Sequence, residues 1–160
     1  MKTSDPVAVS AALADSWRLL EALFREQKFA ALATQTADAP YASLVAFAVT
    51  PDLRRVVFPT RAGSRKGANL EVNPRVALLV DNRTNSDRDY HDAAAVTVIG
   101  SAGFARGSEA DTLRKLLLER HPRMAGFLAD SDCLIAVVEV TAYLVVTNFE
   151  TVTKLDPAAR

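Results

Sequence analysis

The stretch FPTRAGSRKGANLEVNPRVALL, from Phe58 to Leu79, decides how the rest of the chain is interpreted. It contains Ser64, a favoured N-cap residue, and then a short run that Asn73-Pro74 ends, so it predicts a helix between two strands. The first two helical positions would be Arg65 and Lys66. Because a helix N-terminus carries partial positive charge, two cations there are unfavourable unless an anion is bound.

A bound phosphate is the simplest anion that would reverse this cost. Arg65 would bind it through two parallel hydrogen bonds, and Lys66 would act as a point charge. The same stretch also offers two hydroxyl donors, Thr60 and Ser64, and two small residues that let the backbone approach closely, Gly63 and Gly67. The pattern matches neither the P-loop nor the GxGxxG turn. The alternative is that both cations are solvated, or pair with Glu71 or with acidic residues of another chain.

The composition narrows the classes of function. The 160 residues include 19 Lys plus Arg and 19 Asp plus Glu, and this zero net charge argues against a broad surface for nucleic acid or membrane and favours self-association. The single cysteine, Cys133, lies in an apolar run and is expected to be buried and inert. His91 and His121 lack metal-ligand spacing, and the acidic 81–92 loop lacks the spacing of a calcium loop, so we expect no metal site. No signal peptide or membrane span is evident, which predicts a cytoplasmic protein.

The hydrophobic spacing predicts one long helix and a series of strands. Apolar residues recur at helical spacing over 10–27. Six segments have the character of strands: 29–36, 41–50, 55–58, 75–81, 93–104 and 134–146. Gly100 and Gly103 lie inside one of the longest of these, where they indicate bends or bulges.

The connections between the early strands are too short for parallel crossovers. The pattern therefore predicts a closed antiparallel barrel with helices at its ends. We expect a single domain over 1–160, with the N-terminal helix at 10–27, the barrel at about 29–147 and a polar tail at 148–160.

The stretch quoted first resembles the cofactor segment of the pyridoxamine 5'-phosphate oxidase-like, FMN-binding split-barrel family. That segment has an aromatic strand end, a Thr, then Ser-Arg-Lys, Asn-Pro and an apolar strand. The resemblance covers about residues 12 to 147, although only the part from Ser64 to Pro74 is specific, and the polar loop after Asp81 is similar to that of short bacterial members. It implies a mainly β, α+β fold: a six-stranded antiparallel split β-barrel with flanking helices.

The resemblance also implies a cofactor and an assembly, namely a homodimer that binds two FMN molecules at its interface. Arg65 and Lys66 match the pair that holds the FMN phosphate, and Pro59-Thr60 match the strand end beside it. Residues 43–47 match the strand that lies along the flavin. Asn82 and Arg83, in the polar loop after Asp81, are further candidates for ring contacts, and the alternative for Arg83 is an ion pair with Asp81 or Asp87. The candidate cofactor-binding residues are Arg65, Lys66, Ser64, Thr60, Pro59, Ser43, Leu44, Val45, Ala46 and Asn82. No catalytic residue is identified.

Three departures from the family pattern bear on activity. The chain ends NFETVTKLDPAAR, without the Arg-x-His that holds the vitamin phosphate, and Ala48 and Ala95 stand where the family has a Lys and a Gln. We therefore expect an FMN-dependent oxidoreductase acting on an unknown small molecule, and not a true pyridoxine phosphate oxidase. The alternatives are a haem-binding or haem-utilisation split-barrel protein with His121 as the candidate ligand, and a non-catalytic flavin-binding module.

Overall fold

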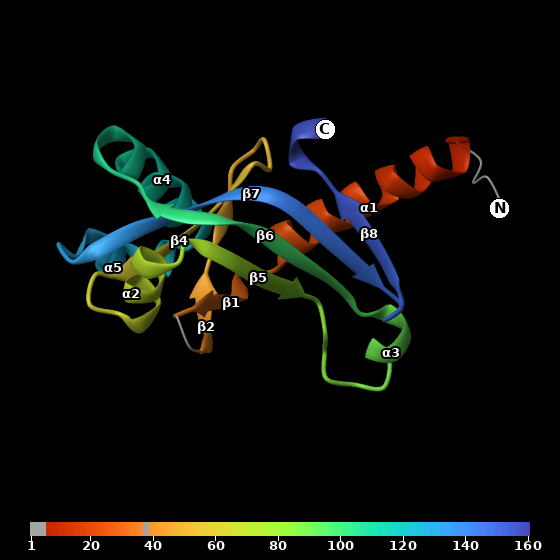
Figure 1. The fold of residues 1–160 in the computed structure, drawn as a ribbon, viewed down its shortest axis with the longest axis horizontal. Helices are drawn as coiled ribbons and strands as arrows, with labels where there is room; N and C mark the ends of the chain where they lie inside the picture. The colour runs from red at the N-terminus through yellow and green to blue at the C-terminus, as the bar shows by residue number, and fades with distance from the viewer. Residues whose placement is uncertain (1–5, 37–38) are drawn as a thin grey trace.

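The computed structural model describes residues 6–36 and 39–160 (Figure 1). The elements run in the order α1 (Pro6–Glu26), β1 (Phe29–Gln35), β2 (Pro40–Ala46), β3 (Ala48–Val49), β4 (Arg55–Arg61), α2 (Arg65–Val72), β5 (Arg75–Asp81), α3 (Asp89–Asp92), β6 (Ala94–Phe104), α4 (Gly107–Arg120), η1 (Pro122–Met124), α5 (Ala125–Ala129), β7 (Cys133–Thr147), β8 (Thr151–Leu155) and η2 (Pro157–Ala159). Among the helices within these residues, none is long and apolar enough to cross a membrane.

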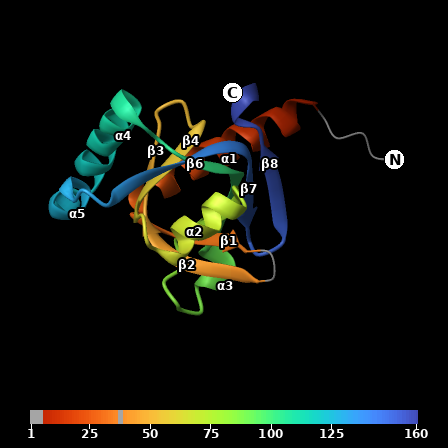
Figure 2. The same ribbon diagram turned by 60° about the vertical axis from the view of Figure 1, so that its left-hand side comes forward.

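All paired strands are antiparallel and form one sheet in the order β2-β1-β5-β6-β7-β4-β3, with β8 paired to β7. The strands at the two ends of this order, β2 and β3, are consecutive in the chain and are separated only by Phe47. This short connection curls the sheet into a split barrel (Figure 2). The structure thus confirms the predicted fold class, a mainly antiparallel β fold with flanking helices.

The predicted number of six strands is wrong, because the sheet has eight strands within residues 6–36 and 39–160. The segment 41–50 was expected to be one strand, but it divides at Phe47 into β2 and β3. The Phe47 N–H donates to the Lys28 carbonyl at 3.3 Å, and the Phe47 carbonyl lies 2.8 Å from Nε2 of His121. Both backbone groups of Phe47 are thus used outside the strand ladder, and the strand is interrupted there.

The additional strand β8 comes from the segment expected to be a polar tail. Backbone pairing explains why a weakly patterned sequence forms a strand here. β4 pairs with the first part of β7, up to Glu139, and leaves the later edge of β7 available. β8 pairs with that edge, from Tyr143 to Thr147. Only Leu155 of this strand is buried, so few apolar side chains mark it in the sequence.

The main core lies between α1 and the inner face of the sheet. Leu20, Leu23 and Phe24 of α1 are buried there, and the Phe24 ring packs edge-on against Phe47 at 5.8 Å between centroids. The facing strands contribute mainly β-branched and leucine side chains: Leu32, Val56, Val76, Leu78, Val80, Val96, Val98 and Val145. α1 therefore covers the apolar inner face of the sheet with its own apolar face, which the helical spacing of its hydrophobic residues predicted.

A second core lies on the other side of β3, β4 and β7, under α4 and α5. Leu113 and Leu117 of α4 pack there with Ile135 and Val137 of β7. Cys133 belongs to this cluster, and burial raises the pKa of its thiol. The predicted burial of Cys133 is thus confirmed, and its protonated form is favoured.

Candidate functional site

The helix predicted after Ser64 is present as α2, from Arg65 to Val72. Ser64 is its N-cap, with extended backbone angles of φ −77° and ψ 150°, and its Oγ accepts a hydrogen bond from the Gly67 N–H at 3.1 Å. The Thr60 hydroxyl lies 2.8 Å from the same Oγ. Thr60 is buried at the end of β4, so the strand end and the helix start are joined through two hydroxyl groups.

The first turn of α2 has donors that lack protein acceptors. In residues 6–36 and 39–160, the backbone N–H groups of Arg65 and Lys66 have no hydrogen-bond acceptor, and neither side chain has a carboxylate oxygen within 4.0 Å. Pairing with Glu71, one of the alternatives from the sequence, is therefore not seen. Two cationic side chains and two free N–H groups at a helix start form the donor set of an anion site.

β2 contributes to the same place. The Arg65 guanidinium lies over the Tyr41 ring, 4.7 Å from its centroid. Tyr41 and Ser43 are both half-buried and alternate with exposed residues, so they share one face of β2. The Ser43 Oγ is buried and has no hydrogen-bond partner in the described residues. Figure 2 shows α2 beside β1 and beside β2, the strand that carries Tyr41 and Ser43.

Asn69 fastens α2 to β1, a role that the sequence did not reveal. Its Nδ2 donates to the Thr34 Oγ1 at 2.9 Å, and both residues are buried. A polar residue between Ala68 and Leu70 gives no local signal of such a bond, because its partner is 35 positions away in the chain. This bond fixes the helix relative to β1 and β2, the strands that carry the other candidate residues.

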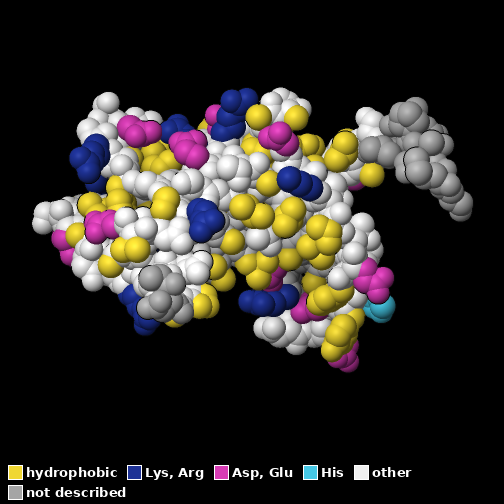
Figure 3. Space-filling view, viewed as in Figure 1, with side chains coloured by type: hydrophobic (Ala, Val, Ile, Leu, Met, Phe, Trp, Pro, Cys, Tyr) yellow, Lys and Arg dark blue, Asp and Glu magenta, His cyan; other side chains and the backbone are white. Residues whose placement is uncertain are grey.

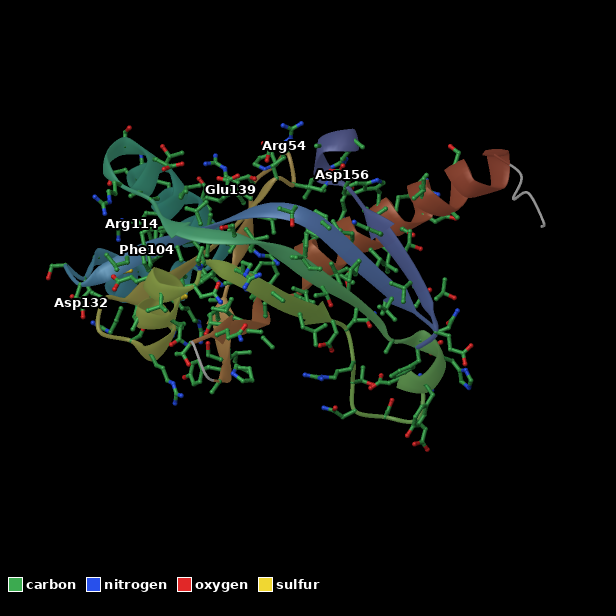
Figure 4. The ribbon with its side chains drawn as sticks, viewed as in Figure 1. Arg54, Phe104, Arg114, Asp132, Glu139 and Asp156 are labelled. Carbon is green, nitrogen blue, oxygen red and sulfur yellow. The ribbon has the colours of Figure 1, made fainter. Side chains whose placement is uncertain are left out.

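Arg61 does not join this candidate anion site, although it is close to Arg65 in sequence. Its Nη1 donates to Asp130 at 3.0 Å and to Asp132 at 2.5 Å, and its guanidinium lies over the Phe127 ring at 4.9 Å. The hydrogen bond from Arg61 holds the pKa of Asp130 below its ordinary value. Figure 4 labels Asp132, which lies by the start of β7 at the same end of the sheet as α2. Arg61 therefore anchors the loop before α2.

Gly63, in the loop before α2, and Gly67, in the first turn of α2, have different surroundings. A Cβ on Gly67 would lie 3.1 Å from the Ser64 Oγ and 3.2 Å from the Arg61 carbonyl oxygen, so Gly67 allows the loop to close over the helix. A Cβ on Gly63 would meet nothing within 4 Å. From the sequence we expected both glycines to let the backbone approach an anion closely, whereas the atoms near Gly67 in the structure belong to the loop before α2.

Of the other candidates near α2, most are buried by the fold. Pro59 and Thr60 are buried in β4, and Val45 and Ala46 are buried at the end of β2. Only Leu44 is open, with 71% of its surface exposed. A ligand would therefore reach Leu44 through its side chain, and the buried four chiefly through their backbone groups.

Asn82 and Arg83 are not brought to this site within one chain. They follow β5, beside α3, and Figure 1 shows α2 and α3 at opposite ends of the sheet. The Asn82 Oδ1 accepts from the Ala94 N–H at 2.8 Å, and the Arg83 Nε lies 3.3 Å from Asp81. Arg83 also borders an apolar hollow of about 150 Å³ with Leu79, Ala95, Val146 and Phe149. Of the ten candidate residues, Asn82 thus lies apart from the others, which are near α2.

The histidines take different positions. His121 is buried, with 6% of its surface exposed, and its Nε2 is engaged by the Phe47 carbonyl. His91 is exposed on α3. Within the described part of the chain, no group of three or more His, Cys, Asp and Glu side chains could hold a metal ion.

Several solved structures share this fold. A haem-binding protein from Mycobacterium smegmatis has a TM-score of 0.77 at 22% identity, over 92% of this chain and 59% of that protein, so the chain spans less than two thirds of its length. The haem storage protein HutZ from Vibrio cholerae has a TM-score of 0.69 at 18% identity, over 81% and 92% of the two chains. General Stress Protein 26 from Bacillus anthracis has a TM-score of 0.68 at 16% identity, over 87% and 96%.

The sequence comparisons identify the family. No curated protein sequence matches the chain. A family model, described as pyridoxamine 5'-phosphate oxidase, matches residues 17–145, which include β1 to β7 nearly in full and the whole of α2. Together with the split-barrel fold, this match shows that the chain belongs to the pyridoxamine 5'-phosphate oxidase-like family.

Proposed function

We propose that the protein binds FMN and acts as an oxidoreductase on a small molecule, with the FMN phosphate held at the N-terminus of α2. The observation that carries this proposal is the first turn of α2, where Arg65 and Lys66 combine cationic side chains with unpaired backbone N–H groups. At an exposed helix start each cation costs roughly 0.3–1 kcal/mol, and a bound dianion would reverse the sign of that term. Family membership makes FMN the favoured source of the phosphate.

The residues present fit this cofactor. Arg65, Lys66 and the Ser64 hydroxyl would hold the phosphate, and β2 would lie along the rest of the molecule. A buried hydroxyl without a partner costs about 1–3 kcal/mol, which a ligand could offset. The Ser43 Oγ is such a group, and it lies on the same face of β2 as Tyr41. It would therefore hydrogen-bond to the cofactor.

When bound, FMN supplies the redox chemistry, and the protein supplies binding, orientation and electrostatics. The substrate is expected to differ from the vitamin phosphate. Ala48, at the position of the family Lys, is buried in the core under α4 and offers no charge to a substrate. A small molecule without the vitamin phosphate group is consistent with Ala48 at this position.

A homodimer would complete the cofactor site. The outer face of the sheet, on the side away from α1, carries exposed apolar residues that include Leu44 on β2, Ile99 on β6 and Val152 on β8. Figure 3 shows hydrophobic side chains gathered over β5, β6 and β7 on this face. Such patches commonly mark interfaces. Because Asn82 and Arg83 lie far from Arg65 within one chain, they would reach a cofactor only from the partner subunit.

Flavin titration tests the proposal directly. Purified protein mixed with FMN should show a shifted visible spectrum and quenched flavin fluorescence, and Arg65→Gln should weaken the affinity. Arg123→Gln, an exposed arginine in η1, serves as the matched control and should bind as wild type. Absence of bound flavin, together with equal affinities for wild type and Arg65→Gln, would contradict the proposal. Turnover with NADH or NADPH as electron donor would then separate an enzyme from a non-catalytic flavin-binding module.

Haem binding is the second candidate, because two proteins that share the fold are described as haem-binding and haem storage proteins. The bond between the His121 Nε2 and the Phe47 carbonyl argues against His121 as the axial ligand, since that bond would have to break. Haem titration of wild type and His121→Ala, followed by the Soret band, tests this candidate. Identical spectra would exclude His121 as the ligand, and no Soret change in wild type would exclude haem binding.

A further inference from the structure

The contact between Tyr41 and Arg65 joins β2 to α2. Arg65 is exposed at the first position of α2, and Tyr41 is half-buried on β2, at one end of the strand order. The guanidinium carbon lies 4.7 Å from the ring centroid, within the range of a cation–π interaction. The ring therefore restricts where an otherwise mobile arginine can hold its charge.

The contact with the ring leaves the binding groups of Arg65 available, because its guanidinium makes no hydrogen bond or ion pair within the described residues. A guanidinium that rests on a ring through its flat face keeps its five N–H donors around its edge. Those donors can form two parallel hydrogen bonds with a phosphate. A lysine has no flat face and no fork of donors, so it could not be held in the same way.

We propose that Tyr41 is a specificity-determining positioning residue, which holds Arg65 so that the site prefers a flavin bearing a phosphomonoester over the same flavin without one. This inference rests on the proposed FMN site. Tyr41 acts through Arg65, which would contact the phosphate. Riboflavin, which has no phosphate, would gain nothing from the stack.

The ring of Tyr41 can be changed without disturbing the core. Tyr41 belongs to neither buried cluster, and its hydroxyl has no hydrogen-bond partner in the described part of the chain. Its backbone pairs with Thr34 of β1 whatever the side chain. Tyr41→Leu therefore removes the aromatic face, whereas Tyr41→Phe removes only the hydroxyl and should retain the stack.

The experiment measures the affinities of these variants for FMN and for riboflavin. Tyr41→Leu should raise the Kd for FMN by roughly two- to tenfold, as expected for loss of an exposed cation–π contact. Its Kd for riboflavin should stay the same. Tyr41→Phe should bind both as wild type does. Tyr90→Leu, which changes an exposed tyrosine on α3 at the other end of the sheet, is the matched control.

A double-mutant comparison shows whether Tyr41 acts through Arg65. In the Arg65→Gln background, Tyr41→Leu should cause no further loss of FMN affinity. The inference is overturned if that loss persists, if riboflavin binding weakens as much as FMN binding, or if Tyr41→Phe behaves like Tyr41→Leu.

Inorganic phosphate separates this inference from the proposed function. If wild type binds no FMN, the proposed function fails, and the inference is judged by the rise in Tm that phosphate causes. A rise that Tyr41→Leu abolishes and Tyr41→Phe retains would support an anion site positioned by Tyr41. A rise that is equal in all variants, or no rise at all, would overturn it.

Discussion

Arg61 and Asp132 are joined by a hydrogen bond of 2.5 Å between the guanidinium Nη1 and the carboxylate Oδ1, across 71 positions of the chain. The Ala62 N–H donates to the Asp132 carbonyl at 3.1 Å, so side chain and backbone tie the same two segments together. One segment leads into α2, and the other leads into β7. The position of the candidate phosphate loop therefore depends on a turn that is distant in sequence.

Arg61→Met should loosen this loop without unfolding the protein. Both partners are about half exposed, and such ion pairs contribute roughly 0–1 kcal/mol to stability. We expect a small fall in the free energy of unfolding, faster amide exchange at Ala62 and Ser64, and a few-fold weaker FMN binding. Arg18→Met, which removes an exposed pair with Asp15 on α1, is the control and should leave amide exchange in the loop unchanged.

The outcome also tests how Arg61 acts. If Arg61→Met weakened FMN binding as strongly as Arg65→Gln while amide exchange in the loop stayed the same, Arg61 would be a direct phosphate ligand. The contacts with Asp130 and Asp132 argue for the indirect role.

The fold could be predicted where one local signal was sufficient. Buried and exposed side chains alternate along β5 and β6, and apolar residues recur at helical spacing before Gln27. Such a pattern of burial distinguishes a strand from a helix. The break at Phe47 could not be predicted in this way, because its cause is a pair of bonds to Lys28 and His121. β8 was missed for a similar reason, since it forms by pairing with a free edge of β7.

In the candidate site, too, the features that depend on local sequence could be predicted, and those that depend on distant partners could not. Ser64 as the N-cap and Asn73 as the end of α2 follow from residue type and spacing, and both are confirmed. Tyr41 and Asn69 were missed because their roles depend on partners in other elements, Arg65 and Thr34. No spacing rule within a single segment connects such pairs.

Gly67→Ala, in the first turn of α2, and Gly63→Ala, in the loop before it, form a matched pair. At Gly67 the new methyl group would lie 3.1 Å from the Ser64 Oγ and 3.2 Å from the Arg61 carbonyl oxygen, so the loop would have to move by a few tenths of an ångström. Alanine also favours the helix by about 1 kcal/mol over glycine, which should keep the stability near that of wild type. FMN titration should therefore show weaker binding for Gly67→Ala at nearly unchanged Tm. Gly63→Ala should bind as wild type, and equal losses in both variants would contradict the packing argument.

Gly100→Ala should destabilise the sheet. The register between β6 and β7 shifts at Ile99 and Gly100, as the sequence predicted for a bulge, and a Cβ on Gly100 would lie 2.3 Å from the Glu139 carbonyl oxygen. Figure 4 labels Glu139 on β7. Because that neighbour is backbone, the strands must separate, at a cost of about 1–3 kcal/mol or more. Urea denaturation measures the change. Gly103→Ala, where a Cβ would meet nothing within 4 Å, is the control, and equal midpoints for the two variants would refute the expectation.

The loop between β5 and α3 should respond to acid through Asp89. Its carboxylate accepts hydrogen bonds from the backbone N–H groups of Thr84 at 2.9 Å, Asn85 at 2.7 Å and Ser86 at 3.3 Å. These bonds favour the ionised form, so the pKa of Asp89 is lowered from its ordinary value of 3.8. Since the folded pKa is the lower one, the contribution to stability is complete above pH of about 4 and is lost as the pH falls through the folded pKa.

Amide NMR shifts of these three donors, followed from neutral pH to about pH 2, measure this effect. We expect the three signals to titrate together with a midpoint below the ordinary aspartate pKa, and their exchange to quicken as the carboxylate is protonated. In Asp89→Asn the shared titration should disappear, because the amide oxygen carries no charge to neutralise. Asp92→Asn, an exposed residue at the end of the same helix, should leave it intact. If the three amides still titrated together in Asp89→Asn, another carboxylate would organise the loop, and the role assigned to Asp89 would be wrong.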